Sequence, residues 1–485
     1  MGISFNDIPA NLRTPGTYIE FDNSLASLGA QEFKILVIGQ RLAAGTVAAG
    51  EPTLVTRAED ANTWFGAGSM LAAMLAMALD VGPSIPVWAI ALDDNGAGAA
   101  ATGTVTISTP PTAAGTVNLY IAGQRVQAGV GASDTVTNVA DAVVAAITAD
   151  TSLPVTASNV AGVITLTAKH KGEVGNDIDL RDGYYSEALP TGVSLTYVAM
   201  SGGTSNPDMA TAITAMGDDW YNWIASPYTD AANLAAMTSE MNDRWGPMQQ
   251  IDGRVFVSYR DTLANVSTFG NGLNDPHLSC MAADAAPQPP YIWAAVNCAT
   301  AAKYLSIDPA RPLQTLVLKG ILPPAKTKQW IQDERNTLLF DGIATHKVDS
   351  AGLVRIERQI TTYQKNAAGL IDASYLDINT PETLSRLRFR QRQMFAQRYP
   401  RHKLADNGTN YPAGQAIITP NIAALELLAL FQSFIELGWV EDYDAYKATL
   451  ITEINSSDPN RLDYRDQPNL VNQLRVVAGQ TQFIV

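Results

Sequence analysis

Two uninterrupted apolar runs, separated by a helical pattern, constrain the fold of this chain more than any other feature. The runs are residues 33–38 and 85–92, and residues 66–79 between them have the spacing of a helix. A strand with no polar face must be covered on both sides, as in a parallel sheet with helices above and below it. The strand–helix–strand order therefore predicts an α/β unit with a parallel crossover.

The α/β alternation resumes at residue 205 and continues to about residue 375. Apolar strands again alternate with helical segments, and the block ends in a hairpin-like pair of strands. The predicted strands are 220–225, 254–259, 278–282, 314–318, 345–349 and 353–362, and the predicted helices are 230–245, 292–305 and 327–339.

Residues 95–204 differ in character from the segments on either side. Charged residues become rare, and Thr, Val, Ala and Gly dominate. Glycine-rich joints flank this stretch, which contains three predicted strands and a helix at 135–149. We therefore expect a small, surface-exposed α+β domain inserted between strands of the parent fold.

The last part of the chain is predominantly helical and then strand-like. Helices are predicted at 381–399, 422–437 and 442–454, followed by apolar strand patterns that reach the C-terminus. A strand pattern also occurs near the N-terminus at 17–22, with no neighbouring segment to pair with it. A lone strand must join a sheet of its own chain or of a neighbour.

These patterns predict an α/β core with an inserted small α+β domain, a mixed helical and β C-terminal domain, and extended terminal strand arms. The core comprises 29–94 and 205–375, the insertion 95–204, the N-terminal linking arm 1–28, and the C-terminal domain 376–485 with its arm at about 472–485. We expect the strand arms to pair between subunits through Thr17, Tyr18, Ile19, Glu20, Phe21, Leu474, Val476, Phe483, Ile484 and Val485.

The composition narrows the classes of function. Charged residues make up 16% of the chain, against about a quarter in a typical soluble protein, so few charges remain to cover a large surface. We infer that much of the surface lies against other subunits. The net charge of −15 argues against a sequence-independent nucleic-acid coat, which needs a basic surface.

The N-terminus, the apolar segments and the cysteines indicate where the protein is made. The N-terminus lacks the basic region and apolar run of a secretory signal, and the longest apolar helix candidate, 70–79, is about half a membrane span. We therefore expect no membrane insertion. Cys280 and Cys298 are predicted to be small buried residues of a protein made in a reducing cytosol. A single disulfide bond between them is the alternative.

No motif in the sequence indicates catalysis, a metal or a cofactor. The four histidines, at positions 170, 277, 346 and 402, have no zinc or triad spacing, and no phosphate-binding loop occurs. A calcium-loop-like stretch at 177–183 places Arg181 where an oxygen ligand is required, which predicts a polar turn instead. An enzyme with an unrecognised site remains an alternative.

A basic segment stands out in an acidic chain. Residues 303–403 carry 17 basic and 9 acidic residues, a net charge of +8. Arg386, Arg388, Arg390 and Arg392 lie on one predicted helix, so they form two like-charge pairs at i,i+4 spacing. The pattern fits either a solvated face with internal ion pairs or a docking face for an acidic partner, and like-charge repulsion favours docking.

Four segments spread along the chain carry a family resemblance. They read RTPGTYIEFDNS at 13–24, DASYLDINT at 372–380, QRYPRHKLAD at 397–406 and NLVNQLR at 469–475. They are similar to segments of the tail sheath proteins of contractile-tailed bacteriophages of the Mu type. The 95–204 segment is the variable part and contributes little to the resemblance.

The resemblance implies a structural subunit of a virion tail, assembled in the host bacterial cytoplasm and without enzymatic activity or cofactor. Subunits of this family form hexameric rings that stack helically around a tail tube and contract, which drives the tube through the host envelope for genome delivery. The implied partners are other copies of the chain, the tail tube protein, and the baseplate and tail terminator proteins, without direct nucleic-acid contact. The basic helix with Arg386, Arg388, Arg390 and Arg392 would face the tube. A contractile bacteriocin sheath without DNA and a static lattice protein remain alternatives.

Overall fold

The computed structural model describes residues 31–283, 285–409, 411–412 and 414–484. The chain forms two compact units, and each is described by itself. The larger unit comprises Phe33–Asp308 and Leu313–Pro381, and the smaller contains Pro309–Pro312 and the chain from Glu382 onward. No helix in the described residues combines the length and apolarity needed to cross a membrane.

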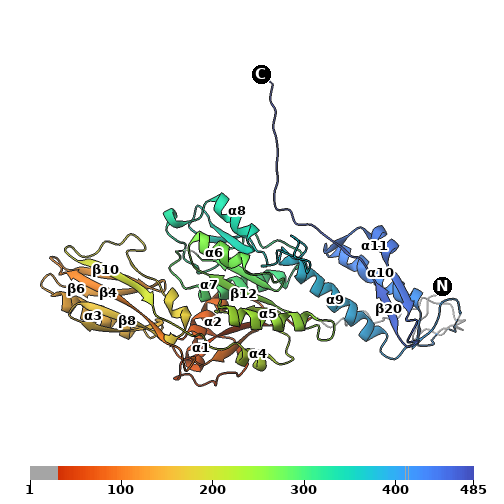
Figure 1. Cartoon of the computed structure of the whole chain (residues 1–485), viewed down its shortest axis with the longest axis horizontal. Coiled ribbons are helices and arrows are strands. Elements are labelled where there is room, and N and C mark those ends of the chain that lie inside the picture. Colours follow the sequence, from red (N-terminus) through yellow and green to blue (C-terminus); the bar gives the residue numbers. More distant parts are fainter. Residues whose placement is uncertain (1–30, 284, 410, 413, 485) are drawn as a thin grey trace, which may run out of the picture. The chain divides into compact units, whose positions relative to one another are not determined.

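An eight-stranded sheet forms the centre of the larger unit (Figure 1). Its strands run in the order β15-β14-β13-β12-β11-β1-β3-β2, and the six inner strands are parallel to one another. They are β1 (Ile35–Gln40), β2 (Thr53–Val55), β3 (Val87–Leu92), β11 (Trp223–Ala225), β12 (Arg254–Tyr259), β13 (Leu278–Ala282), β14 (Ile343–Val348) and β15 (Val354–Arg358). The two edge strands, β2 and β15, are antiparallel to their neighbours.

The side chains of β1 show why both faces of this sheet must be covered. All six residues of β1 are buried. Ile35 and Val37 belong to one apolar cluster, whereas Leu36 and Ile38 belong to the other, as the alternation of side chains along a strand requires. The predicted parallel α/β unit is therefore confirmed.

Two layers of helices enclose the sheet (Figure 1). One cluster combines the sheet with α1 (Ala58–Phe65), α2 (Met70–Asp80) and α7 (Pro290–Leu305). The other combines it with α4 (Ala210–Met216), α5 (Ala231–Trp245), α6 (Leu263–Asn271) and α8 (Gln332–Phe340). The chain first crosses from β1 to β3 and later continues at β11, on the opposite side of β1, so the winding reverses beside β1.

The 95–204 segment forms two antiparallel sheets of its own. Four strands make one sheet and three make the other, and both pack with a helix around a separate apolar cluster. The elements are β4 (Ala100–Thr109), β5 (Gly115–Ile121), β6 (Gln124–Val130), α3 (Val136–Ala149), β7 (Val155–Val160), β8 (Val163–Lys171), β9 (Leu180–Asp182) and β10 (Ser194–Ser201). The short 3₁₀ helix Glu173–Asp177 follows β8.

The smaller unit is built on helices and short two-stranded sheets. The long helix α9 (Asn379–Arg398) crosses the boundary between the two units. The other elements are β16 (Lys403–Leu404), β17 (Ile417–Ile418), α10 (Pro420–Glu436), β18 (Val440–Glu441), α11 (Tyr443–Thr449), β19 (Ile451–Ile454), β20 (Leu462–Arg465) and β21 (Asn469–Leu470).

A stacked aromatic pair lies at the core of the smaller unit. The ring of Phe431 in α10 lies parallel to that of Tyr446 in α11, with centroids 3.7 Å apart. Both residues are buried and share one cluster with Leu387, Phe434 and other apolar residues.

Two predicted elements are wrong. The strand predicted at 314–318 is irregular chain with an isolated bridge between Val317 and Arg355. Thr315 has a φ of 71°, which a regular strand does not allow. The helix predicted at 442–454 is shorter, because α11 ends at Thr449 and the following residues form β19.

We predict that Phe431→Ala lowers the free energy of unfolding of the smaller unit by about 3 to 5 kcal/mol, because it removes a fully buried ring. The matched control is Leu425→Ala on the same helix, where the side chain is 53% exposed and the expected change is about 0.5 kcal/mol or less. Hydrogen exchange of the α10 amides measures both values. Equal losses in the two variants would contradict the assignment of Phe431 to the core.

Candidate interaction surfaces

The end of the chain is an exposed apolar arm. Residues 471–484 belong to no helix or strand. The Phe483 side chain is 83% exposed and that of Ile484 is fully exposed, and Leu474 and Val476 are also exposed. Val485 lies outside the described residues. Such a run of exposed apolar side chains is unusual on a soluble surface and indicates a binding segment.

Three contacts hold the base of the arm to its own unit. β21 pairs antiparallel with β18, the Val471 amide donates to the Trp439 carbonyl at 3.1 Å, and the Gln473 side chain donates to the Ala310 carbonyl at 3.2 Å. Pairing ends there, although the sequence predicts strands beyond it. The strand pattern of the C-terminus is therefore extended chain, and no strand partner lies within the described residues.

The predicted N-terminal strand cannot be placed. Thr17, Tyr18, Ile19, Glu20 and Phe21 lie outside the described residues. Their pairing between subunits stays a prediction.

The β19–β20 pair forms a sheet of two strands. The strands pair antiparallel from Ile451–Arg465 to Ile454–Leu462, and in the described part of the chain neither has a neighbour on its outer side. Ile451 is 44% exposed. An open strand edge offers unpaired amides and carbonyls to any further strand.

Sequence reasoning missed this sheet, because it continued the preceding helix to residue 454. A usable signal was present in the β-branched residues Ile451, Thr452 and Ile454, followed by the turn sequence Asp458-Pro459-Asn460.

The predicted basic helix is α9, and its arginines differ in environment. Arg386, Arg388 and Arg390 are half-buried, whereas Arg392 is exposed. Nearer the C-terminal end, the Arg398 guanidinium pairs with the Glu426 carboxylate of α10.

Other residues of α9 attach it to the rest of the smaller unit. Leu387 packs in its apolar cluster. The Gln391 amide donates to the Asp466 carboxylate at 2.6 Å, and the Tyr399 hydroxyl donates to the Glu426 carboxylate at 2.7 Å. Part of α9 is therefore structural. The four arginines lie on two sides of the helix, Arg386 with Arg390 and Arg388 with Arg392, and both pairs remain docking candidates.

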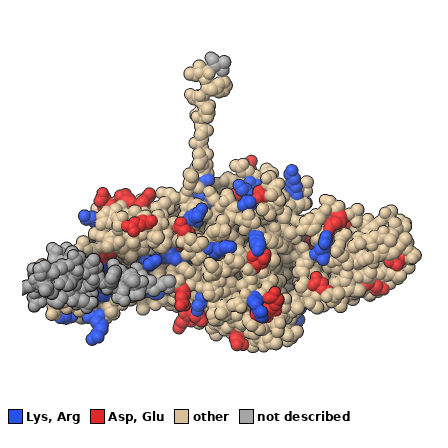
Figure 2. Space-filling model, turned by 180° about the vertical axis from the view of Figure 1, so that it is seen from behind, with Lys and Arg blue, Asp and Glu red and all other residues tan. Residues whose placement is uncertain are grey.

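Charge is distributed unevenly over the surface. Figure 2 shows acidic and basic side chains interspersed over the larger unit, whereas the 95–204 segment presents a mostly uncharged face in this view. This distribution matches the scarcity of charged residues in that part of the sequence.

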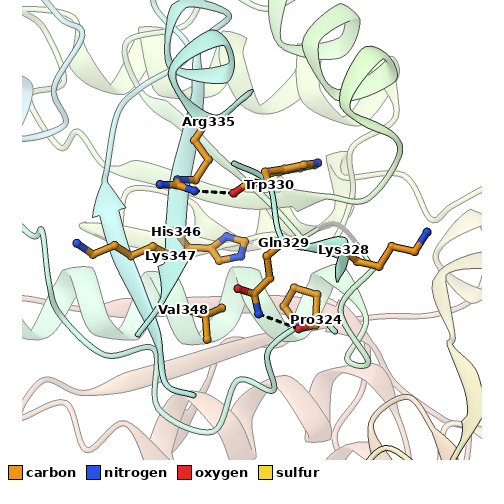
Figure 3. A pocket seen from close by; sticks show the side chains of 8 residues that line it. All are labelled: Pro324, Lys328, Gln329, Trp330, Arg335, His346, Lys347 and Val348. Carbon is orange, nitrogen blue, oxygen red and sulfur yellow. Dashed lines mark hydrogen bonds between the residues drawn. The ribbon is translucent and has the colours of Figure 1, made fainter. Parts of the chain in front are cut away.

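A polar hollow of about 190 Å³ lies beside β14 (Figure 3). Arg335 and His346 line it, but the Arg335 guanidinium is engaged by two bonds to the Glu357 carboxylate, at 2.7 and 3.1 Å. The amines of Lys328 and Lys347 point away from the hollow (Figure 3). None of the described residues that line it carries a hydroxyl or a carboxylate.

His346 is a buried, uncharged ring in this hollow. Its centroid lies 4.7 Å from that of Trp293. Burial lowers the pKa of His346 to about 4, and the nearby Arg335 cation acts in the same direction while Glu357 opposes it.

The remaining candidates for site chemistry are dispersed. The described residues contain no group of three or more His, Cys, Asp or Glu side chains arranged to hold a metal ion. Cys280 and Cys298 are both buried and are not joined by a disulfide, and burial raises the pKa of Cys280 to about 12.

Two family models and a full-length relative match this chain, and all three are phage tail sheath proteins. Residues 202–362 match the phage tail sheath protein central domain, and residues 371–484 match the phage tail sheath C-terminal domain. Over 488 aligned residues the chain is 45% identical to the Mu-like prophage FluMu tail sheath protein of Haemophilus influenzae, with all of both chains covered.

Two solved structures show weaker likeness. The sheath tail protein of Desulfitobacterium hafniense has a TM-score of 0.49 at 13% identity, covering 94% of this chain and 100% of that one. The anti-feeding prophage helical sheath in its contracted state has a TM-score of 0.46 at 9% identity, covering 97% and 99%.

We predict that acid destabilises the larger unit through His346. The unfolded ring takes up a proton near pH 6.5 and the folded ring near pH 4, so this contribution is fully present above pH 6.5 and is lost as the pH falls toward 4. His346→Gln should remove up to about 3 kcal/mol of this pH dependence. Unfolding free energies between pH 4 and pH 8 measure the effect.

The control for this prediction is His402→Gln, because His402 is exposed. Burial raises the pKa of Asp177 to about 6, which opposes His346 over part of the same range, so the difference between variants is the quantity to compare. An unchanged pH profile in His346→Gln would contradict the prediction.

Proposed function

The chain belongs to the phage tail sheath family as a structural subunit of a contractile phage tail, and we propose that it polymerises as stacked hexameric rings around a tail tube. Contraction of the stack would drive the tube through the host envelope and deliver the genome. Its role in this assembly would be mechanical rather than catalytic. The exposed apolar arm at 471–484 is the observation that carries the proposal.

We propose that the arm of one copy adds a strand to the β19–β20 sheet of another. The arm supplies extended chain with exposed apolar side chains, and the sheet supplies two edges that carry no further strand among the described residues. Strand addition gives affinity through main-chain hydrogen bonds and specificity through alternate side chains. The N-terminal arm at 1–28 would form a second link of the same kind.

These links would keep copies joined while the rings move. The smaller unit ends its own strand pairing at β21 and holds the arm at Gln473, so the chain beyond Arg475 could change direction without disturbing the fold. A link of this kind tolerates a large rigid-body displacement of one subunit relative to the next.

The proposed partners follow from this arrangement. The tail tube protein would contact the C-terminal domain at 376–485, including Arg386, Arg388, Arg390 and Arg392 of α9. Baseplate and tail terminator proteins would contact the two ends of the stack. The 95–204 segment would lie on the outer surface, and assembly would take place in the bacterial cytoplasm.

We predict that deleting residues 473–485 leaves a folded subunit that no longer forms long tubes, because the donated strand is absent. Sedimentation under polymerising conditions and electron microscopy measure tube formation, and circular dichroism verifies the fold. Deletion of residues 1–23 should have the same effect. Tubes of normal length from both truncated chains would refute strand donation.

A variant that keeps the full length of the arm tests whether its apolar side chains, rather than its length alone, are needed for tube formation. Replacing Leu474, Val476, Phe483 and Ile484 by Ser should also abolish long tubes. The matched control replaces the polar residues Gln480 and Gln482 by Ser and should polymerise normally.

We predict that the double variant Arg388→Glu and Arg392→Glu weakens association with the tail tube, because it reverses charge on one face of α9. Sheath–sheath polymerisation should be unchanged. Co-sedimentation with tubes at several salt concentrations measures the association, and the wild-type salt dependence should be steeper than that of the variant. The control is Lys326→Glu with Lys328→Glu, outside α9. Equal tube binding of wild type and the α9 variant would exclude this surface.

A further inference from the structure

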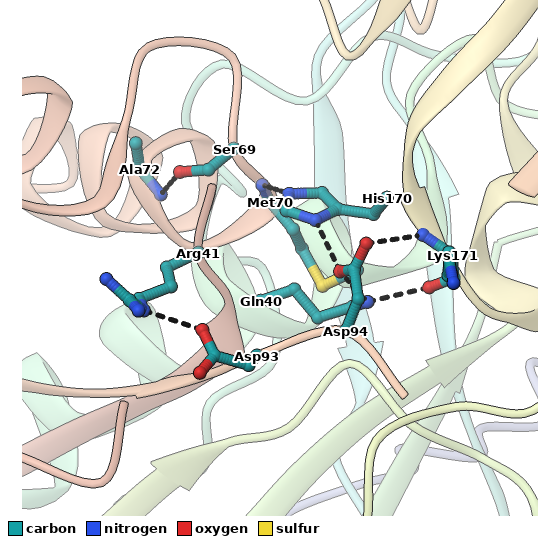
Figure 4. Close-up of polar contacts among 9 residues, drawn as sticks. All are labelled: Gln40, Arg41, Ser69, Met70, Ala72, Asp93, Asp94, His170 and Lys171. Carbon is teal, nitrogen blue, oxygen red and sulfur yellow. Dashed lines mark hydrogen bonds and ion pairs between the residues drawn. The ribbon is translucent and has the colours of Figure 1, made fainter. Parts of the chain in front are cut away.

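Residues of the 95–204 segment are bonded to the core at the place where a doubly wound sheet usually binds a ligand. In such sheets the ligand binds at the carboxyl ends of the strands, where the winding reverses. In this chain that place lies beside the end of β1, and Gln40 ends that strand while Asp94 follows β3. His170 and Lys171, from the end of β8 in the 95–204 segment, occupy it (Figure 4).

Polar contacts attach the segment to this place. The Gln40 amide donates to the Lys171 carbonyl and to the Asp94 carboxylate, both at 2.7 Å. The Lys171 backbone amide donates to the other Asp94 oxygen at 2.9 Å. Asp94 therefore holds the end of β8 in place.

His170 bridges this carboxylate to the beginning of α2. Its Nδ1 lies 3.0 Å from Asp94 Oδ1, and its Nε2 lies 3.0 Å from the backbone nitrogen of Met70 (Figure 4). The ring is 5% exposed. A backbone amide can only donate, so Nε2 must accept and carry no proton. The proton of the neutral ring therefore lies on Nδ1, where it is donated to Asp94.

A second proton would have to bind at Nε2, the side that faces α2. It would oppose the Met70 N–H, and the positive charge would lie at the positive end of the helix. The ion pair with Asp94 would strengthen, so the ring could keep that partner but not Met70. Protonation thus breaks one half of the bridge and preserves the other.

The Asp94 carboxylate has a pKa below its ordinary value, so it stays charged at the pH values at which a histidine ring takes up a proton. Burial acts to raise its pKa, but hydrogen bonds from His170, the Lys171 amide and Gln40 together hold it below the ordinary value. The first turn of α2 contains no acidic residue, and no charged side chain occurs between Gly66 and Asp80.

Other charged groups surround the bridge. Lys169 donates to the Thr151 carbonyl at 2.8 Å and to the Ala67 carbonyl, just before α2, at 3.4 Å, and Lys171 donates to the Gly96 carbonyl at 3.3 Å. Further charged or titratable groups near the bridge, among the described residues, include the Arg41–Asp93 ion pair, Glu173, Tyr228 and Asp230.

We propose that His170 is a proton-sensitive latch between the 95–204 segment and the α/β core. The neutral ring accepts a hydrogen bond from the first amide of α2, and protonation breaks that bond while the Asp94 tether persists. The segment would stay attached to the core through bonds that do not involve His170, from Arg181 to the Ala285 carbonyl, from Tyr184 to the Pro323 carbonyl and from Arg260 to the Asp177 carbonyl. This inference is independent of strand donation and of the role of the arms.

Hydrogen–deuterium exchange on the full chain tests the latch, with rates corrected for the intrinsic effect of pH. Between pH 8 and pH 5.5 the Met70 amide should lose protection, with an opening constant that rises by up to about tenfold per pH unit when one proton is taken up. The Lys171 amide, bonded to Asp94, should stay protected and serves as the internal control. Sedimentation should verify the same assembly state at each pH.

Two variants separate the latch from a general effect of acid. His170→Gln retains an acceptor for Met70 but has no titrating ring, so its Met70 protection should not depend on pH. His402→Gln removes an exposed histidine and should behave as wild type. Met70 protection that is independent of pH in the wild type, or an equal loss in His170→Gln, would overturn the proposal.

A measurement on the unmodified chain covers the case in which His170→Gln does not fold. The chain has four histidines, so selective ¹⁵N labelling can resolve their rings by nuclear magnetic resonance. The proposal requires the Nδ1–H tautomer for His170 at pH 8. An Nε2–H tautomer at that pH would contradict it.

Discussion

The structure depends on covering both faces of one parallel strand. The side chains of β1 alternate between two apolar clusters, so neither helical layer can be lost without exposing half of its residues. The inner strands on either side share this requirement, which joins helices from distant parts of the sequence. A rigid core of this kind can transmit a displacement as one body, since close-packed interiors deform little.

Much of this core could be predicted from local patterns. Residues 33–38 and 85–92 have no polar face, and they correspond to β1 and β3. The same reasoning placed β12 and β13 correctly. It failed at residues 451–454, where β19 depends on pairing with β20 across a turn, because local helix propensity says nothing about a partner further along the chain.

The contacts of single polar residues could not be predicted in the same way. His170 is separated by 76 residues from Asp94 and by 100 from Met70, and nothing in the sequence near it marks the bridge. Its spacing excluded a metal site or a triad but could not indicate a joint. The basic helix was correctly placed as a helix, yet the partner of Arg398 on α10 became visible only in the fold.

A donor arm and an acceptor sheet on the same unit would have a consequence for the size of the assembly. A contact between two different surfaces, unlike a self-complementary one, leaves a free donor at one end and a free acceptor at the other after every addition. Growth then has a direction but no intrinsic stopping point. The contacts between subunits would therefore not determine the length of a finished sheath. A template of fixed length would have to determine it.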